Sequence, residues 1–198
     1  MQFETTKRFI LASQSPRRRE LLGQLGIEFD VQSADVEETS VPFETAAQYV
    51  RDVALLKTRA IDAPDAVVIG SDTIVVKDGQ LLHKPKNHVE AVAHLKALSG
   101  TTHEVMTAVA IIEGHKEVTF VETVRVTFYP LSDEFIEAYV QTGDPFDKAG
   151  GYGIQTDGVF FVEKIEGDYL SVVGLPLARL TRTLLDEKWI ALQQEAVQ

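Results

Sequence analysis

The 198-residue sequence contains no cysteine, and this absence excludes several kinds of chemistry. Without thiols the chain can form no disulfide framework, thiolate nucleophile or Cys-ligated zinc site. No uninterrupted apolar run approaches the roughly 20 residues that a membrane-spanning helix needs. The first residues, Met1 to Glu4, do not resemble the start of a signal peptide. We therefore expect a cytoplasmic protein with no membrane partner.

Basic residues are few relative to acidic ones. The chain has 19 Lys and Arg against 30 Asp and Glu, a formal net charge of -11. A general nucleic-acid-binding protein needs a basic face, so we expect no nucleic-acid partner, and any phosphate site must be local. Nothing gives the five histidines metal-ligand spacing. The length suits a single domain, residues 1–198, with a good hydrophobic core.

Hydrophobic periodicity predicts strands and helices that alternate along the chain, as in an α/β protein. The predicted strands are residues 9–12, 27–31, 66–76, 105–112, 118–128, 159–165 and 169–173. The predicted helices follow Ser15, span 44–60, lie between Asn87 and Gly100 and between Ser132 and Gly143, and span 176–185.

The first predicted helix begins with an unusual arginine cluster. Ser15 is a good N-cap, and proline at position 16 suits the first helical position. Three arginines, 17 to 19, then fill the first turn, where the positive end of the helix dipole disfavours cations. Because backbone N–H groups and guanidinium groups favour phosphate, we interpret this turn as an anion site. The alternative is that the arginines are solvated surface charges.

An aspartate interrupts the most apolar predicted strand, residues 66–76. Both faces of this strand are apolar, which indicates a central position, and an unpaired carboxylate there would cost several kcal/mol. Asp72 therefore needs a cation, a metal or neutralisation. We favour a functional role over a structural aspartate bonded to backbone amides. Gly70 shares the face of Asp72 and would leave room for a ligand to approach the backbone.

One lysine is a candidate partner of this carboxylate, and a second lysine lies at an unusual position on a helix. A hairpin turn at residues 77–80 folds the chain back, so that Lys84 lies opposite Thr73 and near Asp72. Lys57 lies on the apolar face of the helix at 44–60 and either extends from its edge or reaches into a cleft. The glycine-rich residues 144–155 form either a plain surface loop or one whose backbone approaches a ligand.

Six short motifs occur together and in order: LASQSPRRRELL, GSDT, KP, LSG, DKAGGYGIQ and VGLP, beginning at residues 11, 70, 84, 98, 147 and 173. Together they resemble the Maf family of nucleoside triphosphate pyrophosphatases over residues 9–185. The resemblance implies an elongated, two-lobed α/β fold related to inosine triphosphate pyrophosphatase, with a mixed twisted sheet, flanking helices and a central cleft. It also implies hydrolysis between the α- and β-phosphates, with Mg²⁺ or Mn²⁺ as cofactor, and suggests a homodimer.

The resemblance also assigns roles to individual residues. Asp72 matches the proton acceptor, and Lys57 and Lys84 match further catalytic positions in the cleft. Glu38 matches an acidic cleft position and, with Asp72, is the expected metal ligand. The residues that match phosphate-contacting positions are Ser13, Ser15 and Arg18.

Three positions distinguish the branches of the family. Arg17, Thr73 and Gln155 are the residues of the dTTP/UTP branch, whereas the 7-methyl-GTP branch has others. Thr73 and Gln155 would offer neutral hydrogen bonds to the imide edge of the base. Small departures from the family pattern, at Gly151, Thr156 and His83, lie beside matched residues and bear on fine specificity more than on the reaction. Modified pyrimidine triphosphates are further candidate substrates. The alternatives are a nucleotide-sensing regulator of septum formation with incidental hydrolysis and a pyrophosphatase of the same fold acting on deaminated purines.

Overall fold

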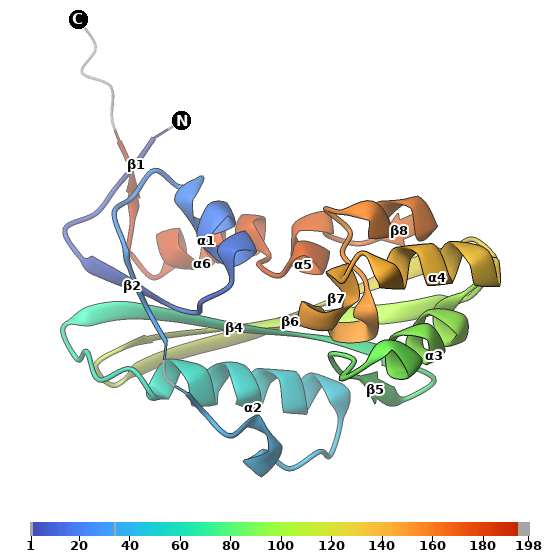
Figure 1. Ribbon diagram of the computed structural model, residues 1–198. Helices are drawn as coiled ribbons and strands as arrows, with labels where there is room; N and C mark the ends of the chain where they lie inside the picture. The colour runs from blue at the N-terminus through green and yellow to red at the C-terminus, as the bar shows by residue number, and fades with distance from the viewer. Residues whose placement is uncertain (1, 34, 194–198) are drawn as a thin grey trace, which may run out of the picture.

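The computed structural model describes residues 2–33 and 35–193. Its centre is a seven-stranded mixed sheet in the order β3-β2-β4-β6-β7-β8, with β5 paired to β4 (Figure 1). The strands of this sheet are β2 (Arg8–Ala12), β3 (Asp30–Gln32), β4 (Ala66–Lys77), β5 (Gln80–Leu82), β6 (Thr102–Glu113), β7 (Lys116–Phe128) and β8 (Val162–Glu166). The expected mixed α/β architecture is confirmed.

All the described α-helices except the last begin where the sequence provides a capping side chain. Ser15, Thr45, Asn87, Ser132 and Asp168 each accept a hydrogen bond from a backbone N–H of the helix that follows. The α-helices are α1 (Pro16–Gly23), α2 (Ala46–Arg59), α3 (His88–Leu98), α4 (Asp133–Gln141), α5 (Tyr169–Val173) and α6 (Leu177–Asp186). Shorter 3₁₀ turns are η1 (Glu38–Ser40), η2 (Asp144–Asp147), η3 (Ala149–Gly151) and η4 (Asp157–Phe161).

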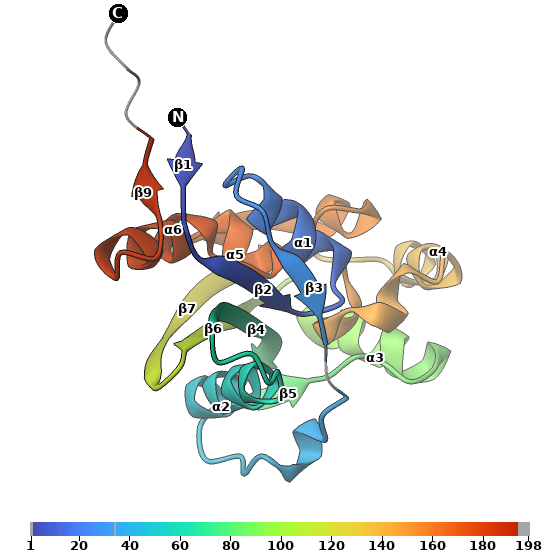
Figure 2. The same cartoon turned by 90° about the vertical axis from the view of Figure 1, so that its left-hand side faces the viewer.

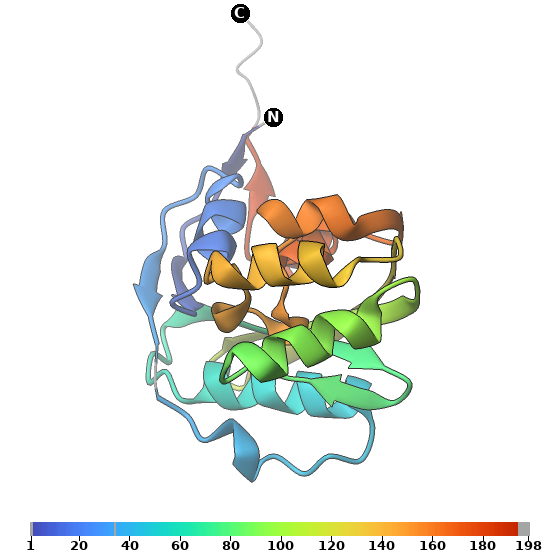
Figure 3. The ribbon, with the colours of Figure 1, turned by 45° about the vertical axis from the view of Figure 1, so that its right-hand side comes forward.

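The long strands β4, β6 and β7 cross the whole molecule, and helices cover both of their faces (Figure 1). Helix α2 packs on one face, while α1, α5 and α6 lie over the other. Helices α3 and α4 lie side by side at the far end of the strands (Figure 3). Helices α1 and α6 lie at one end of the long strands and α3 and α4 at the other, and these two pairs mark two lobes.

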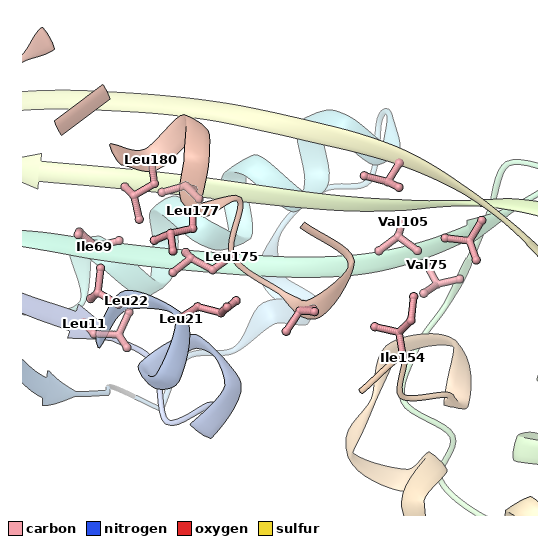
Figure 4. Packing of buried hydrophobic residues seen from close by; sticks show 14 of the residues in the cluster. Leu11, Leu21, Leu22, Ile69, Val75, Val105, Ile154, Leu175, Leu177 and Leu180 are labelled. Atoms are coloured by element: carbon pink, nitrogen blue, oxygen red, sulfur yellow. The ribbon is translucent and has the colours of Figure 1, made fainter. Parts of the chain in front are cut away.

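The largest hydrophobic cluster extends along β4 from one lobe to the other (Figure 4). At one end Leu11 and Ile69 lie with the leucines of α1 and α6, and at the other Ile154 lies beside Val75. Because the core is continuous along the strands, burial of apolar side chains fixes the position of both lobes relative to β4.

The edge of β4 is open between the two lobes. Strand β2 pairs in parallel with residues 66–69 of β4, and β5 pairs antiparallel with residues 75–77. Among the described strands, only β6 pairs with residues 70–74. Side chains from both faces of β4 can therefore reach the same opening, at the carboxyl end of β2, where α/β proteins commonly bind ligands.

Three predicted strands differ from the structure. Residues 169–173 form helix α5, because Asp168 accepts hydrogen bonds from Leu170 N and Ser171 N and so caps a helical turn. Residues 157–161 form η4, so that β8 begins only at Val162. The predicted strand at 27–31 begins later, as the exposed strand β3.

A second, two-stranded sheet joins the two ends of the described chain. Strands β1 (Phe3–Glu4) and β9 (Ala191–Leu192) are antiparallel and adjacent (Figure 2). Before β9, the buried indole of Trp189 donates from Nε1 to Glu113 Oε2 at 2.7 Å. The pairing of β1 with β9 was not predicted. Across residues 2–33 and 35–193, no helix is both long and apolar enough to cross a bilayer.

Candidate active site

A cleft of about 650 Å³ opens at the unpaired edge of β4. This volume suits a small molecule of nucleotide size. The cleft is lined by nine residues that the sequence singled out: Ser15, Arg17, Arg18, Glu38, Lys57, Asp72, Thr73, Lys84 and Gln155. Ser13 lies just behind the wall, where its Oγ accepts from Ser15 N at 3.2 Å. The structure thus brings together residues more than 130 positions apart in the chain.

The carboxylate of Asp72 has a lysine partner, as its burial requires. Asp72 is only 7% exposed, on the face of β4 that packs against α2. Lys57, in the last turn of α2, places Nζ at 2.7 Å from Asp72 Oδ1. The same Nζ lies 2.7 Å from Glu38 Oε1, at the more exposed side of the cleft. One ammonium therefore bridges two carboxylates, and the cleft interpretation of Lys57 is confirmed.

Lys84 does not provide the counter-ion of Asp72. The hairpin has the predicted register, with Val75 opposite Leu82, but β5 ends there, before Lys84. Lys84 is exposed in the cleft wall and makes no hydrogen bond or ion pair with any described residue. Its ammonium is therefore available to a ligand.

Gly70 has a different role from the one expected. A Cβ at this position would lie 2.0 Å from Thr58 Oγ1 and 3.1 Å from the carbonyl oxygen of Ala54. Both atoms belong to α2. The glycine therefore allows α2 to pack closely on β4, and the expectation that a ligand approaches the protein backbone at Gly70 is wrong.

The Arg18 guanidinium is fixed by three hydrogen bonds. Nε donates to Gly174 O at 2.9 Å, and the Nη atoms donate to Ser13 Oγ at 3.4 Å and Thr73 Oγ1 at 3.1 Å. Burial lowers the pKa of Arg18 and the nearby Asp72 opposes this shift, yet arginine remains protonated at neutral pH. Because guanidinium has five N–H donors, two remain for a ligand.

Arg17 and Arg18 line the cleft, whereas Arg19 is exposed and is not among the lining residues. Arg18 N lies 3.5 Å from the capping Ser15 Oγ, so α1 begins at the cleft wall. The positive end of the helix and two guanidinium groups thus meet at one wall. This arrangement favours an anion, as the sequence interpretation expected.

Three further residues hold this constellation, and the sequence interpretation gave them no role. Thr107 on β6 lies directly opposite Thr73, with 2.9 Å between the hydroxyl oxygens. Thr107 Oγ1 also donates to Ser171 O at 2.7 Å, and Ser71 Oγ donates to Gly174 O at 3.1 Å. A signal was present, because Thr107 is the one polar residue in the apolar run from Val105 to Ile112.

The loop at residues 144–156 forms the wall of the cleft opposite α1, and ion pairs and hydrogen bonds within the loop region hold it together. Lys148 Nζ pairs with Asp144 Oδ1 at 2.8 Å and with Asp147 Oδ1 at 2.6 Å. Asp144 Oδ2 accepts from Tyr139 OH at 2.5 Å and from Thr156 Oγ1 at 2.6 Å. Burial opposes ionisation of Asp144, but the hydrogen bonds from these three partners lower its pKa below the ordinary value.

This loop positions two of the three residues that the sequence interpretation expects to set specificity. Gln155 is exposed at its end, and Asp147 Oδ2 pairs with Arg17 Nη1 at 3.3 Å across the cleft. Gly150 has φ +71°, and a Cβ there would lie 2.9 Å from Val75 Cγ2. Glycine therefore brings the loop backbone against β4 at this point.

Glu38 and Asp72 are the expected metal ligands, and they lie on either side of Lys57 Nζ. Within the described ranges, no group of three or more His, Asp or Glu side chains could hold a metal ion. Mg²⁺ and similar ions are commonly bound by one or two carboxylates, with the other ligands supplied by phosphates and water. Because Lys57 already holds Asp72 Oδ1 and Glu38 Oε1, the two carboxylates would hold a divalent cation through their other oxygens, together with a phosphate-rich ligand.

Comparison with known proteins finds a matching family model and similar sequences. A family model described as Maf-like protein matches residues 8–187. A dTTP/UTP pyrophosphatase of Bacillus cytotoxicus is 49% identical over 180 residues, which cover 90% of this chain and 94% of that protein. A dTTP/UTP pyrophosphatase of Bacillus cereus is 49% identical over 183 residues, with coverage of 91% and 90%.

Two solved structures share the fold. The Staphylococcus aureus Ham1 protein aligns with a TM-score of 0.50 at 15% identity, over 92% of this chain and 100% of that one. A HAM1 protein from Coxiella burnetii also gives a TM-score of 0.50, at 12% identity, over 91% and 100%. At such low identity, the likeness bears on the architecture alone.

Proposed function

The chain belongs to the Maf family, and from this premise we propose that it is a nucleoside triphosphate pyrophosphatase that hydrolyses dTTP and UTP. The observation that carries the proposal is the pairing of buried Asp72 with Lys57 in a cleft whose other wall presents Arg17 and Arg18. The names of the relatives support the choice of substrate. In reaction terms the protein is a nucleotide diphosphatase that acts on the α–β phosphoanhydride.

The cations of the cleft match the charge of the substrate. A nucleoside triphosphate has about four negative charges at neutral pH, and phosphoryl-transfer enzymes stabilise them with fixed positive groups. Arg18 has two free donors, Lys84 has no protein partner among the described residues, and Lys57 lies beside the acidic pair. We assign phosphate binding to Arg18, Ser15 and Lys84, and we assign to Ser13, which lies behind the wall, the support of Arg18.

Asp72 is the proposed proton acceptor. Its carboxylate would orient a water and remove its proton while the water oxygen attacks the α-phosphorus. The bond from the α-phosphorus to the bridging oxygen then breaks, and pyrophosphate leaves with its charge held by the basic groups. Lys57 fixes the direction of the Asp72 carboxylate through the contact at Oδ1. A divalent cation held by Asp72 and Glu38 would supply charge neutralisation and water activation.

Pyrimidine specificity is proposed to depend on Arg17 and Gln155, on the two facing walls of the cleft. The Gln155 amide can donate and accept at the imide edge of thymine or uracil, whereas the edge of cytosine has a different donor pattern.

We also propose, from the family resemblance, a homodimer that acts in the cytoplasm and removes surplus or modified pyrimidine triphosphates. Size-exclusion chromatography tests the dimer, for which the expected mass is twice the 21.9 kDa of one chain.

Pyrophosphate release from a panel of dTTP, UTP, CTP, ITP and 7-methyl-GTP, each with Mg²⁺ or Mn²⁺, tests the substrate. We expect dTTP and UTP to be cleaved fastest. Preference for ITP would identify a purine enzyme of the same fold, and binding without turnover would identify a nucleotide-sensing regulator.

The Asp72→Asn variant should lose at least about a hundredfold in turnover, as expected without a general base. Near-normal pyrophosphate release by this variant would refute the assignment.

A further inference from the structure

We infer that Thr107 is a positioning residue, which with the Ser171 carbonyl directs the Thr73 hydroxyl toward Arg18 and so orients that guanidinium for the phosphate chain. This inference rests on the proposed function, because it assigns a triphosphate to the cleft. It concerns a buried residue on β6 that does not line the cleft itself.

The direction of each hydrogen bond follows from which groups can only donate or only accept. The Ser171 carbonyl only accepts, so Thr107 must use its single hydroxyl proton in the 2.7 Å bond to that oxygen. Thr107 can then only accept from Thr73, at 2.9 Å. Thr73 therefore donates its hydroxyl proton to Thr107, and its oxygen accepts from Arg18 Nη2 at 3.1 Å.

The Ser171 carbonyl is itself held in place. Asp168 Oδ2 accepts from Ser171 N at 2.9 Å and from Ser171 Oγ at 2.6 Å. Both Thr107 and Ser171 are fully buried, so water cannot replace the partners of either group. The segment that ends α5 also supplies the Gly174 carbonyl that accepts from Arg18 Nε. This short segment thus fixes Arg18 twice, once directly and once through two threonines.

This arrangement changes the expected role of Thr73. A hydroxyl whose proton is committed to Thr107 cannot donate a hydrogen bond to the oxygen of a pyrimidine base. The sequence interpretation gave Thr73 a direct contact with the base. The structure instead connects Thr73 to the phosphate end of the cleft through Arg18, and a hydrogen bond donated to a base oxygen must then come from Gln155 or Arg17.

The test compares Thr107→Val with a matched control on the same sheet. Thr102 and Thr127 form a second threonine pair, with 2.8 Å between the hydroxyls, and neither residue lines the cleft. Thr127→Val removes an equivalent hydroxyl contact from β7 without touching Arg18. Thr107→Ser retains the hydroxyl and serves as the conservative rescue.

Calorimetric binding of inorganic tripolyphosphate, with kcat/KM for dTTP and UTP, gives the readout. Thr107→Val should weaken tripolyphosphate binding by about three- to tenfold, the range expected for one hydrogen bond. It should lower kcat/KM for both nucleotides by the same factor, so that their ratio is unchanged. Thr107→Ser and Thr127→Val should bind tripolyphosphate like the wild type.

Wild-type tripolyphosphate affinity in a folded Thr107→Val would overturn the inference, as would a changed dTTP-to-UTP ratio. If Thr107→Val does not fold, Thr73→Val takes its place and should show the same loss of tripolyphosphate affinity, with the same overturning outcome. The binding measurement needs no catalysis. A wild-type protein that binds tripolyphosphate and cleaves no nucleoside triphosphate would therefore refute the proposed function alone, while the binding comparison still decides the role of Thr107.

Discussion

Substitution of Gly70 by alanine separates two explanations of this glycine. If glycine leaves room for a ligand, Gly70→Ala should raise KM and leave the stability of the protein unchanged. If it allows α2 to pack on β4, the substitution should destabilise the fold. The structure predicts the second result, because the new Cβ would lie 2.0 Å from Thr58 Oγ1 and 3.2 Å from Thr58 Cβ.

The size of the effect follows from two opposing contributions. Overpacking in a core costs about 1–3 kcal/mol when the neighbouring atoms must move. Thr58 Oγ1 is bonded to the Ala54 carbonyl at 2.7 Å and cannot rotate away without losing that bond. Replacing glycine in an ordinary strand conformation regains about 0.4–1 kcal/mol from the unfolded chain. A net loss of about 1–2 kcal/mol corresponds to a fall of about 2–8 °C in Tm for a chain of this length.

Thermal and urea unfolding measure this loss, and a double-mutant cycle locates it. Thr58→Ala removes the closest clashing atom, so Gly70→Ala should cost less in that background, with a coupling of about 1 kcal/mol. Gly23→Ala, at the end of α1, is the matched control because a Cβ there meets no atom within 4 Å. Its stability should equal or exceed that of the wild type.

Activity follows stability at this position, because Lys57 precedes Thr58 in α2. A displaced α2 would pull Nζ away from Asp72, so kcat should fall in Gly70→Ala and recover partly in the double variant. Wild-type stability together with a raised KM in Gly70→Ala would refute the packing argument and restore the ligand explanation.

Other parts of the structure make further predictions. Asp144→Asn should destabilise the fold by about 1–3 kcal/mol at neutral pH. Because the pKa of Asp144 in the folded protein lies below the ordinary 3.8, the difference in unfolding free energy between wild type and variant should shrink as the pH falls below 3.8. A difference that stays constant with pH would contradict the assignment. Gly174→Ala, at φ +128°, should weaken tripolyphosphate binding by displacing the carbonyl that accepts from Arg18, and unchanged affinity would contradict this. Trp189→Phe should lower Tm through the lost bond to Glu113 while kcat is retained. Removal of divalent cations with EDTA should abolish pyrophosphate release without lowering helical content by circular dichroism, whereas full activity in EDTA would refute the metal requirement.

The sequence alone determined the features that depend on neighbouring residues or on simple periodicity. Ser15 as an N-cap, the hairpin after Lys77 and the long strands β6 and β7 all follow from local chemistry and were confirmed. The need for a cation near Asp72 was also evident, because a carboxylate in an apolar strand is costly wherever that strand lies.

Local patterns failed where two short-range signals competed. The apolar residues 169–173 suit either a strand or a helix, and the cap from Asp168 selected the helix. The pairing of β1 with β9 joins residues near opposite ends of the chain, so no periodicity could reveal it.

Only the tertiary structure decided which groups share the cleft. The choice of Lys57 over Lys84 as the partner of Asp72 depends on where α2 packs and where β5 stops. The role of Thr107 on β6 depends on the strand register that places it opposite Thr73 on β4, a residue more than 30 positions earlier in the chain. Alternating side chains normally separate Asp72 from Thr73, and both reach one ligand site because β2 and β5 leave the edge of β4 uncovered between them.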